Sequence, residues 1–262
     1  MTEKSDCATC AIRPTGFCGQ LDDQLHSAVA DCARMVTLPA GKQLWDDHDP
    51  SGFVGVVQSG YLRFQRYGID GRRQILCLLQ PGDIIGDPQD HAKGYAVETA
   101  TAVRICRFDE RRFRQLMQQV PDVARSVYRM RSARLEQLRW LTWSLGVLSA
   151  EERLCAFFAM ATRHMPFEPD GDRGGRLTIR LPRPDIADLL ATSVESISRI
   201  SQKLAAEGLI AIISPGLFHI PDVQRLAQRG CLNDPAAAGS TQIKAAQRAP
   251  GRPMPDRVSQ IA

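Results

Sequence analysis

The sequence has no long hydrophobic run. No stretch of about eighteen apolar residues occurs in its 262 residues, so no membrane-spanning helix is expected. The N-terminus, Met-Thr-Glu-Lys-Ser-Asp, also lacks the apolar core of a secretory signal. These two absences predict a cytoplasmic protein that has no membrane partner.

The sequence also has little excess charge of either sign. Its 33 lysines and arginines against 29 aspartates and glutamates give a net charge of +4, which does not by itself indicate a nucleic-acid partner. Paired acid and base residues, a phosphate-binding loop and a nucleophile motif are missing, so no enzyme activity is predicted. Any case for DNA binding must therefore depend on the geometry of a motif.

Eight cysteines are present, but without an export signal they do not indicate a disulfide framework. Three of them, Cys7, Cys10 and Cys18, fall within twelve residues of a turn-rich segment, residues 1–20, that is too short to bury them in its own core. Thiolates are the ligands of both iron–sulfur clusters and zinc, so this segment predicts a metal centre whose fourth ligand comes from elsewhere. The alternative is a flexible tail with incidental thiols.

The other cysteines have simpler interpretations. Cys32 lies in a helical pattern, Cys77 in a strand-like apolar run and Cys155 beside apolar neighbours, and each is expected to be a small core residue. Cys231 begins a tail, residues 231–262, whose richness in Ala, Gly, Pro, Gln and Arg predicts disorder.

Residues 21–120 have the pattern of a β-roll domain. After a short helix over 21–35, glycine turns separate short runs with strand character up to residue 108. The predicted strands include Phe53–Gln58, Tyr61–Tyr67, Gln74–Leu79 and Thr101–Phe108. Closely spaced strands of this kind indicate a β-roll or jelly-roll barrel.

Residues 109–148 are predicted to be helical, with a long helix opening at Pro121. Apolar residues recur along it at steps of three and four: Val123, Val127, Met130, Leu138, Leu141 and Leu145. Such a stripe suits pairing with its copy in a homodimer, although it could also pack on the β-domain of its own chain at some turns. Arg134 interrupts the stripe and is expected to make the 121–148 seam marginal.

Residues 149–230 predict a winged helix-turn-helix. Ser149 and Glu152 form a capping box, Pro184 begins one helix, and a second helix runs from about Val194 to Ala206. Two apolar runs around Ser214-Pro215-Gly216 then predict the hairpin of the wing. In such a fold the second helix lies in the DNA major groove.

The exposed face of that second helix carries the side chains that suit base edges. Glu195, Ser198 and Arg199 share one face at positions i, i+3 and i+4, and Thr192, Ser193 and Ser196 flank them. Arg199 can bond bidentately to a guanine, and Glu195 can accept from a cytosine. The alternative is an ordinary surface ion pair between Glu195 and Arg199.

The stretch Val194–Arg199 resembles the recognition-helix signature of the CRP/FNR family of bacterial transcription regulators. In the FNR branch, Glu, Ser and Arg at these places recognise the TTGAT half of a palindrome. Ala191 departs from the family, which often has Gly in the turn. The cysteine spacing is similar to that of FNR-type, FnrL-like members, in which an oxygen-labile [4Fe–4S] cluster takes its fourth thiolate from the sensor domain. The matching stretch, residues 98–108, makes Cys106 the implied fourth ligand.

The resemblance implies an α+β protein with a β-roll sensor domain, a dimerisation helix and a C-terminal winged helix-turn-helix. Its implied function is oxygen-controlled dimerisation and binding to double-stranded DNA at a TTGAT-N4-ATCAA-like palindrome, with RNA polymerase as a further partner. A zinc or thiol-redox sensor is the alternative within the family, and an iron–sulfur enzyme is the alternative outside it.

The β-domain also resembles the family's cyclic-nucleotide-binding fold in the segments 38–41, 57–60 and 79–86. The Arg-Ser pair that holds the cyclic phosphate in nucleotide-binding members is absent, because Gly86 is followed by Asp87-Pro88 and residues 93–97 contain no such pair. A buried phosphate without a partner is costly, so no cyclic nucleotide is predicted. Haem ligation by His48 or His91 is a minor alternative.

Overall fold

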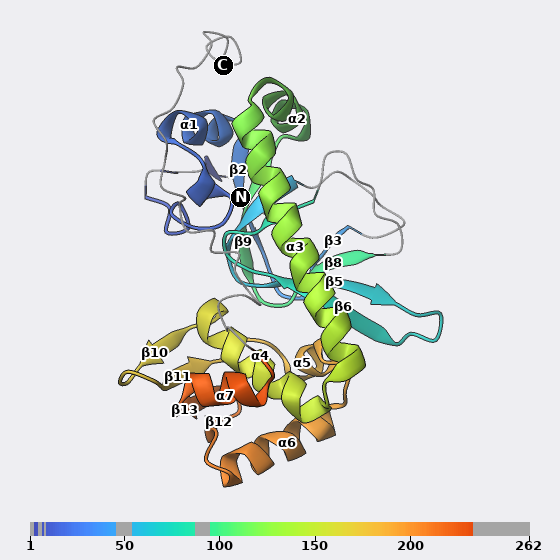
Figure 1. The fold of residues 1–262 in the computed structure, drawn as a ribbon. Helices are drawn as coiled ribbons and strands as arrows, with labels where there is room; N and C mark the ends of the chain where they lie inside the picture. The colour runs from blue at the N-terminus through green and yellow to red at the C-terminus, as the bar shows by residue number, and fades with distance from the viewer. Residues whose placement is uncertain (1–2, 5–6, 8, 46–53, 87–94, 233–262) are drawn as a thin grey trace.

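The computed structural model describes residues 3–4, 7, 9–45, 54–86 and 95–232. Figure 1 shows a β-rich domain alongside one long helix, and a second domain of helices and a small sheet at the lower end of that helix. This arrangement confirms the α+β fold class with its sensor-type domain, connecting helix and helix-turn-helix. Within the described ranges, no helix is both long and apolar enough to cross a membrane.

Two antiparallel sheets form the β-domain. The first has the strand order β1-β2-β9-β4-β7, with bounds Glu3–Lys4, Ala33–Leu38, Val103–Phe108, Val54–Ser59 and Ile84–Ile85. The second has the order β3-β8-β5-β6, with bounds Gln43–Trp45, Ala96–Thr99, Leu62–Tyr67 and Arg73–Leu79. Val57, Leu62 and Ile105 belong to a buried cluster to which both sheets contribute.

The four expected strands appear as β4, β5, β6 and β9, except that Phe53 lies outside the described residues. The strands not foreseen include β3 and β7, which are only three and two residues long. Such short strands are defined by their neighbours' hydrogen bonds rather than by a side-chain pattern of their own. The predicted first helix is α1 (Asp23–Asp31), which follows the short 3-10 helix η1 (Cys18–Gln20) in the chain. Residues of both pack into one hydrophobic cluster.

The helical region 109–148 consists of two helices. The first is α2 (Glu110–Gln119) and the second is α3 (Pro121–Val147), which confirms that Pro121 opens the long helix. Val120 between them is extended, with φ −122° and ψ 95°. The proline that follows disfavours a helical conformation at Val120, and this explains the break.

The predicted dimer seam on α3 needs a correction. Val123, Val127, Met130 and Leu141 are between 0 and 8 % exposed in the single chain, so they pack inside the protomer. Arg134 also faces inward. The most apolar face of an amphipathic helix covers its own core, and this stripe is therefore unavailable to a partner.

A second apolar row faces outward on the same helix. Tyr128 is 70 % exposed and Leu135 is 48 % exposed, while Leu138 and Leu145 of the predicted seam are half-buried. These four residues are separated by steps of seven, three and seven, which is the heptad spacing of a helix-pairing face. The outward row, which keeps Leu138 and Leu145 of the predicted seam, is consequently the candidate face for pairing with a second copy.

The C-terminal domain is built on α4 (Ala150–His164), whose Ser149–Glu152 capping box is confirmed. Its helix-turn-helix is α5 (Arg183–Leu189) and α6 (Val194–Ala206), followed by α7 (Val223–Arg229). The sheet has the order β10-β11-β13-β12, with bounds Phe167–Pro169, Gly175–Thr178, Leu217–Ile220 and Ala211–Ser214. The expected wing is thus present, and β10 and α7 are additions that the sequence pattern did not predict.

Replacing Arg134 with leucine should destabilise the fold by about 3 kcal/mol, because a buried carboxylate loses its counter-charge. Arg134 Nη2 lies 3.0 Å from Asp83 Oδ2, and the Asp83 side chain is only 1 % exposed. Urea unfolding measures the change. Arg139→Leu, which removes an exposed pair with Glu136 on the same helix, is the control and should cost little. Equal stability of the two variants would contradict this account.

Candidate cysteine centre and recognition helix

The N-terminal cysteine segment is fixed to the β-domain by Phe17. This side chain is fully buried, and its ring centroid lies 6.2 Å from that of Phe108 and 6.1 Å from that of Phe113. Its backbone N–H also donates to the carbonyl oxygen of Gly82 at 2.9 Å. Cys18, the next residue, is therefore held beside β9 and α2.

A close backbone approach fixes the same loop. Gly16 has φ +54°, and a Cβ added there would lie 2.1 Å from the carbonyl oxygen of Gly82. Only glycine tolerates both the positive φ and this proximity. The two glycines consequently set the path of the chain between Cys10 and Cys18.

Cys106 lies on β9, where it is opposite Met35 of β2 and Val56 of β4. Its neighbour Ile105 faces the inner core, so the alternation of the strand turns Cys106 to the other side of the sheet. Cys10, Cys18 and Cys106 all pack against the buried cluster that contains Phe17 and Phe108. The structure thus brings the predicted fourth ligand to the N-terminal segment.

The electrostatics of Cys18 connect all four predicted thiols. Burial, together with charge on Cys106, Cys10 and Cys7, raises the pKa of the Cys18 thiol to about 12. Neighbouring thiolates repel one another, so a cation among them would reverse this effect. The donor set is therefore chemically suited to a thiolate-ligated metal centre.

The described residues do not form a completed coordination shell. Among them, no group of three or more His, Cys, Asp and Glu side chains is arranged closely enough to hold a metal ion. Gln58 is a neighbour that the sequence did not suggest: its Nε2 donates to Cys10 Sγ at 3.6 Å. Hydrogen bonds of this kind orient thiolate ligands and tune the centre they hold.

The other predictions about possible ligands concern the remaining cysteines and two histidines. Cys32, Cys77 and Cys155 are buried as predicted, and burial raises the pKa of Cys32 to about 11 and of Cys155 to about 12, which keeps both thiols protonated. Cys231 is exposed. The predictions about His48, His91 and residues 87–94 concern residues outside those that the structure describes.

The predicted recognition helix is confirmed as α6. Ser193 caps it by accepting from the Ser196 N–H at 3.1 Å, and Ile197 and Leu204 are buried on its inner face. Glu195 and Arg199 are exposed on the opposite face, with Ser198 half-buried beside them. The six predicted DNA-binding residues, Thr192, Ser193, Glu195, Ser196, Ser198 and Arg199, thus lie in the turn and the first half of one helix.

The polar contacts on this face differ from the alternative that the sequence left open, a surface ion pair between Glu195 and Arg199. No ion pair within 4 Å joins Glu195 to Arg199 in the part of the chain that the structure describes. Arg199 Nη2 instead lies 3.4 Å from Ser196 Oγ, and Arg183 Nη1 donates to Ser198 Oγ at 3.0 Å. Arg183 was missed in the sequence, where it appears only as the residue before Pro184.

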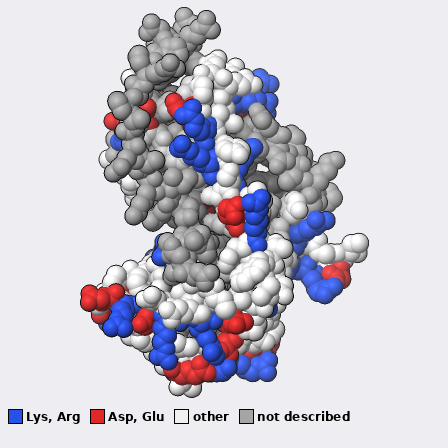
Figure 2. Space-filling model, in the orientation of Figure 1, with Lys and Arg blue, Asp and Glu red and all other residues white. Residues whose placement is uncertain are grey.

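The turn between α5 and α6 contains a strained alanine. Ala191 has φ +47°, the left-handed conformation that favours glycine. The turn is closed by the Thr192 N–H, which donates to the Ala187 carbonyl oxygen at 3.0 Å. Figure 2 shows acidic and basic side chains interspersed over this domain, so the face in view is not a single basic patch.

The comparisons with known proteins agree with this architecture. Residues 35–120 match the family model of the cyclic nucleotide-binding domain, and residues 152–229 match that of the Crp-like helix-turn-helix domain. The nitrogen fixation regulation protein FixK of Bradyrhizobium diazoefficiens is 30% identical over 80% of this chain and 88% of its own length. The transcriptional activator protein FnrL of Cereibacter sphaeroides is 27% identical over 85% of this chain and 90% of its own.

A solved structure shows the same fold. FixK2 from Bradyrhizobium japonicum superposes with a TM-score of 0.68 at 22% identity, covering 75% of this chain and 96% of that one. The helix-turn-helix match implies DNA binding. Taken together, these likenesses show that the chain belongs to the CRP/FNR family, whose members are homodimeric transcription regulators and not enzymes.

Proposed function

We propose that the protein is an oxygen-responsive regulator in which Cys7, Cys10, Cys18 and Cys106 hold a [4Fe–4S] cluster. The convergence of the N-terminal thiols and Cys106 on one hydrophobic cluster supports this proposal most directly. The likeness to FnrL is consistent with it. Because FixK is a relative as well as FnrL, chemical analysis of the protein itself decides which centre the thiols hold.

The chain's own residues connect the thiols to the dimerisation helix. When bound, a [4Fe–4S] cluster supplies an oxygen-labile redox centre tied to four thiolates. The hydrophobic core residues against which Cys18 packs include Phe17, Phe113 and Val123. A change in the position of the cysteine loop would therefore act on the first turns of α3.

DNA recognition is assigned to the exposed face of α6. Glu195, Ser198 and Arg199 would contact base edges of a TTGAT-N4-ATCAA-like palindrome, and Thr192, Ser193 and Ser196 would contact the adjacent backbone. RNA polymerase would be the partner of the DNA-bound dimer. The dimer itself would pair through Tyr128, Leu135, Leu138 and Leu145.

A zinc or thiol-redox sensor remains the second candidate, because four thiolates also suit tetrahedral zinc. The two candidates differ in composition. Anaerobically prepared protein with iron and acid-labile sulfide supports the cluster, whereas stoichiometric zinc without sulfide would replace it.

Cys106→Ala should abolish iron and sulfide incorporation, because the N-terminal segment supplies only three of the four thiolates that the cluster needs. Metal and sulfide analysis after anaerobic reconstitution measures this. Cys155→Ala, which removes a fully buried thiol in the DNA-binding domain, is the matched control and should retain the cluster. Full iron content in the Cys106 variant would overturn the ligand assignment.

Arg199→Ala should cost about 1–3 kcal/mol of specific binding and relax the preference at one base pair. Titrations at fixed salt on the palindrome and its single-base variants test this. Arg229→Ala is the control, since Arg229 lies on α7 and pairs with Glu151. An equal loss on every sequence would make Arg199 a phosphate contact instead.

Leu135→Glu should weaken the anaerobic dimer at least tenfold, which is about 1.4 kcal/mol, because two carboxylates would meet in the outward row. Sedimentation at micromolar concentration follows the change, and air should shift the unmodified protein in the same direction. Tyr67→Glu alters an equally exposed apolar residue on β5 and serves as the control. An unchanged dimer in the Leu135 variant would place the seam elsewhere.

A further inference from the structure

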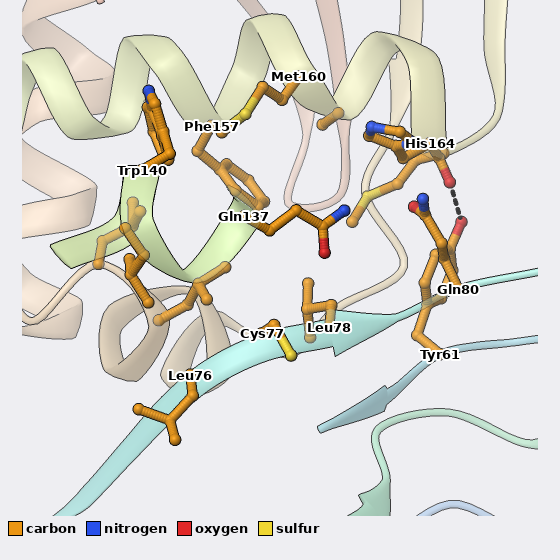
Figure 3. Close-up of a pocket in the computed structure, with 15 residues that line it drawn as sticks. Tyr61, Leu76, Cys77, Leu78, Gln80, Gln137, Trp140, Phe157, Met160 and His164 are labelled. Carbon is orange, nitrogen blue, oxygen red and sulfur yellow. Dashed lines mark hydrogen bonds between the residues drawn. The ribbon is translucent and has the colours of Figure 1, made fainter. Parts of the chain in front are cut away.

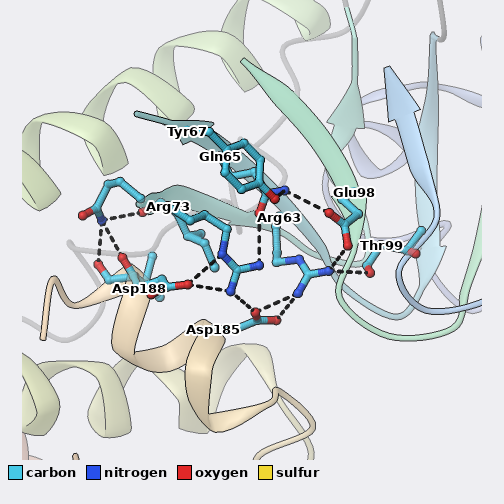
Figure 4. Close-up of polar contacts among 11 residues, drawn as sticks. Arg63, Gln65, Tyr67, Arg73, Glu98, Thr99, Asp185 and Asp188 are labelled. Carbon is cyan, nitrogen blue, oxygen red and sulfur yellow. Dashed lines mark hydrogen bonds and ion pairs between the residues drawn. The ribbon is translucent and has the colours of Figure 1, made fainter. Parts of the chain in front are cut away.

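The β-domain and the helix-turn-helix are joined by buried ion pairs (Figure 4). Arg63 of β5 donates from Nη1 to both carboxylate oxygens of Asp185 on α5, at 2.7 and 2.9 Å. Arg73 of β6 donates to Oδ1 of the same residue at 2.7 Å. The Asp185 side chain is only 2 % exposed, so two arginines from the β-domain neutralise a fully buried carboxylate of the DNA-binding domain.

Further polar contacts extend this connection along α5. Arg73 Nε donates to Asp188 Oδ2 at 2.7 Å, and Gln74 Nε2 donates to the Asp188 carbonyl oxygen at 2.7 Å. On the other side, Arg63 pairs with Glu98 and donates to the Thr99 carbonyl oxygen at 3.2 Å. We refer to Arg63, Arg73, Asp185 and Asp188 as the interdomain ion-pair network.

Apolar packing beside this network is incomplete. A pocket of about 130 Å³ lies between β6, α3, α4 and the end of α5 (Figure 3). Its lining includes Leu78, Trp140, Phe157 and Met160. Close packing fixes the relative position of two surfaces only where it fills the space between them. The directional, charge-assisted hydrogen bonds of the network therefore set where α5 sits on the β-domain.

The position of α5 in turn sets the position of the recognition helix. Ile186 and Ala187 of α5 share one buried cluster with Ile197 and Leu204 of α6. Arg183, at the start of α5, donates to Ser198 on the DNA-facing side of α6. The two helices consequently move as one body.

We propose that Asp185 is a positioning residue for DNA recognition, which orients α6 relative to the β-domain without touching DNA. This inference rests on the proposed function of α6. Buried ion pairs add little net stability compared with apolar packing, but they can specify one arrangement among several. A homodimer on a palindrome needs both recognition helices at a fixed separation and angle. Apparent affinity falls in proportion to the fraction of molecules that hold that arrangement.

Asp185→Asn tests the proposal, since the amide keeps the volume and removes the charge that both arginines share. We expect binding to the palindrome to weaken about tenfold or more. The loss should be the same factor on every single-base variant, with an unchanged salt dependence, because no DNA contact is removed. Asp70→Asn is the matched control: Asp70 pairs with Arg72 in the same β5–β6 hairpin but is half-exposed to solvent.

A measurement without DNA separates this proposal from the proposed function. Cys231 is an exposed thiol that directly follows the C-cap of α7 of the DNA-binding domain, so a spin label there reports the distance between the two copies in the dimer. The unmodified protein and Asp70→Asn should give a narrow distance distribution, and Asp185→Asn a broad one. If the unmodified protein fails to bind the palindrome, the proposed function is wrong, and the distance distribution still decides the role of Asp185.

Arg73→Met provides a second, milder variant if Asp185→Asn does not fold, because Arg73 lies at the more exposed edge of the network. It should weaken binding and broaden the distribution in the same way. In the double variant of Asp185→Asn with Arg73→Met, the losses in affinity should not multiply, since both changes break the same Arg73–Asp185 pair. Binding within twofold of the unmodified protein, together with a narrow distribution, would overturn the proposal.

Discussion

The architecture depends on the commitment of one face of α3 to its own chain. Val123, Val127 and Met130 bury that face in the cluster that also receives the cysteine loop, and Leu141 continues it toward α4. Between them, Arg134 reaches Asp83 and Cys77 inside the protomer. Because this face is occupied, a second copy would have to pair through outward residues of the helix, among them Tyr128 and Leu135. One helix therefore receives the cysteine loop, supports the β-domain and leads into the DNA-binding domain.

The two halves of the molecule use different physics for their functional residues. In the β-domain, Cys10, Cys18 and Cys106 are held against one hydrophobic cluster by aromatic packing around Phe17 and by the contact of Gly16 with Gly82. In the DNA-binding domain, the residues that face outward on α6 follow directly from the period of the helix and from its Ser193 cap. The first arrangement needs a whole tertiary structure, whereas the second needs only the thirteen consecutive residues of the helix and the capping residue before them.

This difference explains what could be predicted. The recognition helix, the capping box and the start of α3 at Pro121 depend on local signals, and the sequence predicts them to the residue. Of the predicted seam on α3, Val123, Val127, Met130 and Leu141 are buried in their own chain, because spacing identifies an apolar stripe but not its partner. Arg134 looked like an interruption for the same reason, since its counter-charge Asp83 is distant in the chain. The interdomain ion-pair network could not be predicted from the sequence, because Arg63 and Asp185 come into contact only after both domains have folded.

The close approach of Gly16 and Gly82 has a consequence for how this sequence can diverge. Both glycines have positive φ, and a side chain at either position would meet the backbone of the other. Neither position can then change alone while the loop keeps its place on the β-domain. Relatives that hold the cysteine segment in this way should carry glycine at both positions. Relatives that lost the segment are released from the constraint at position 16, whereas the φ of +94° at Gly82 favours glycine with or without the segment. Glycine at position 16 is therefore the residue expected in an alignment of relatives that keep the N-terminal segment docked.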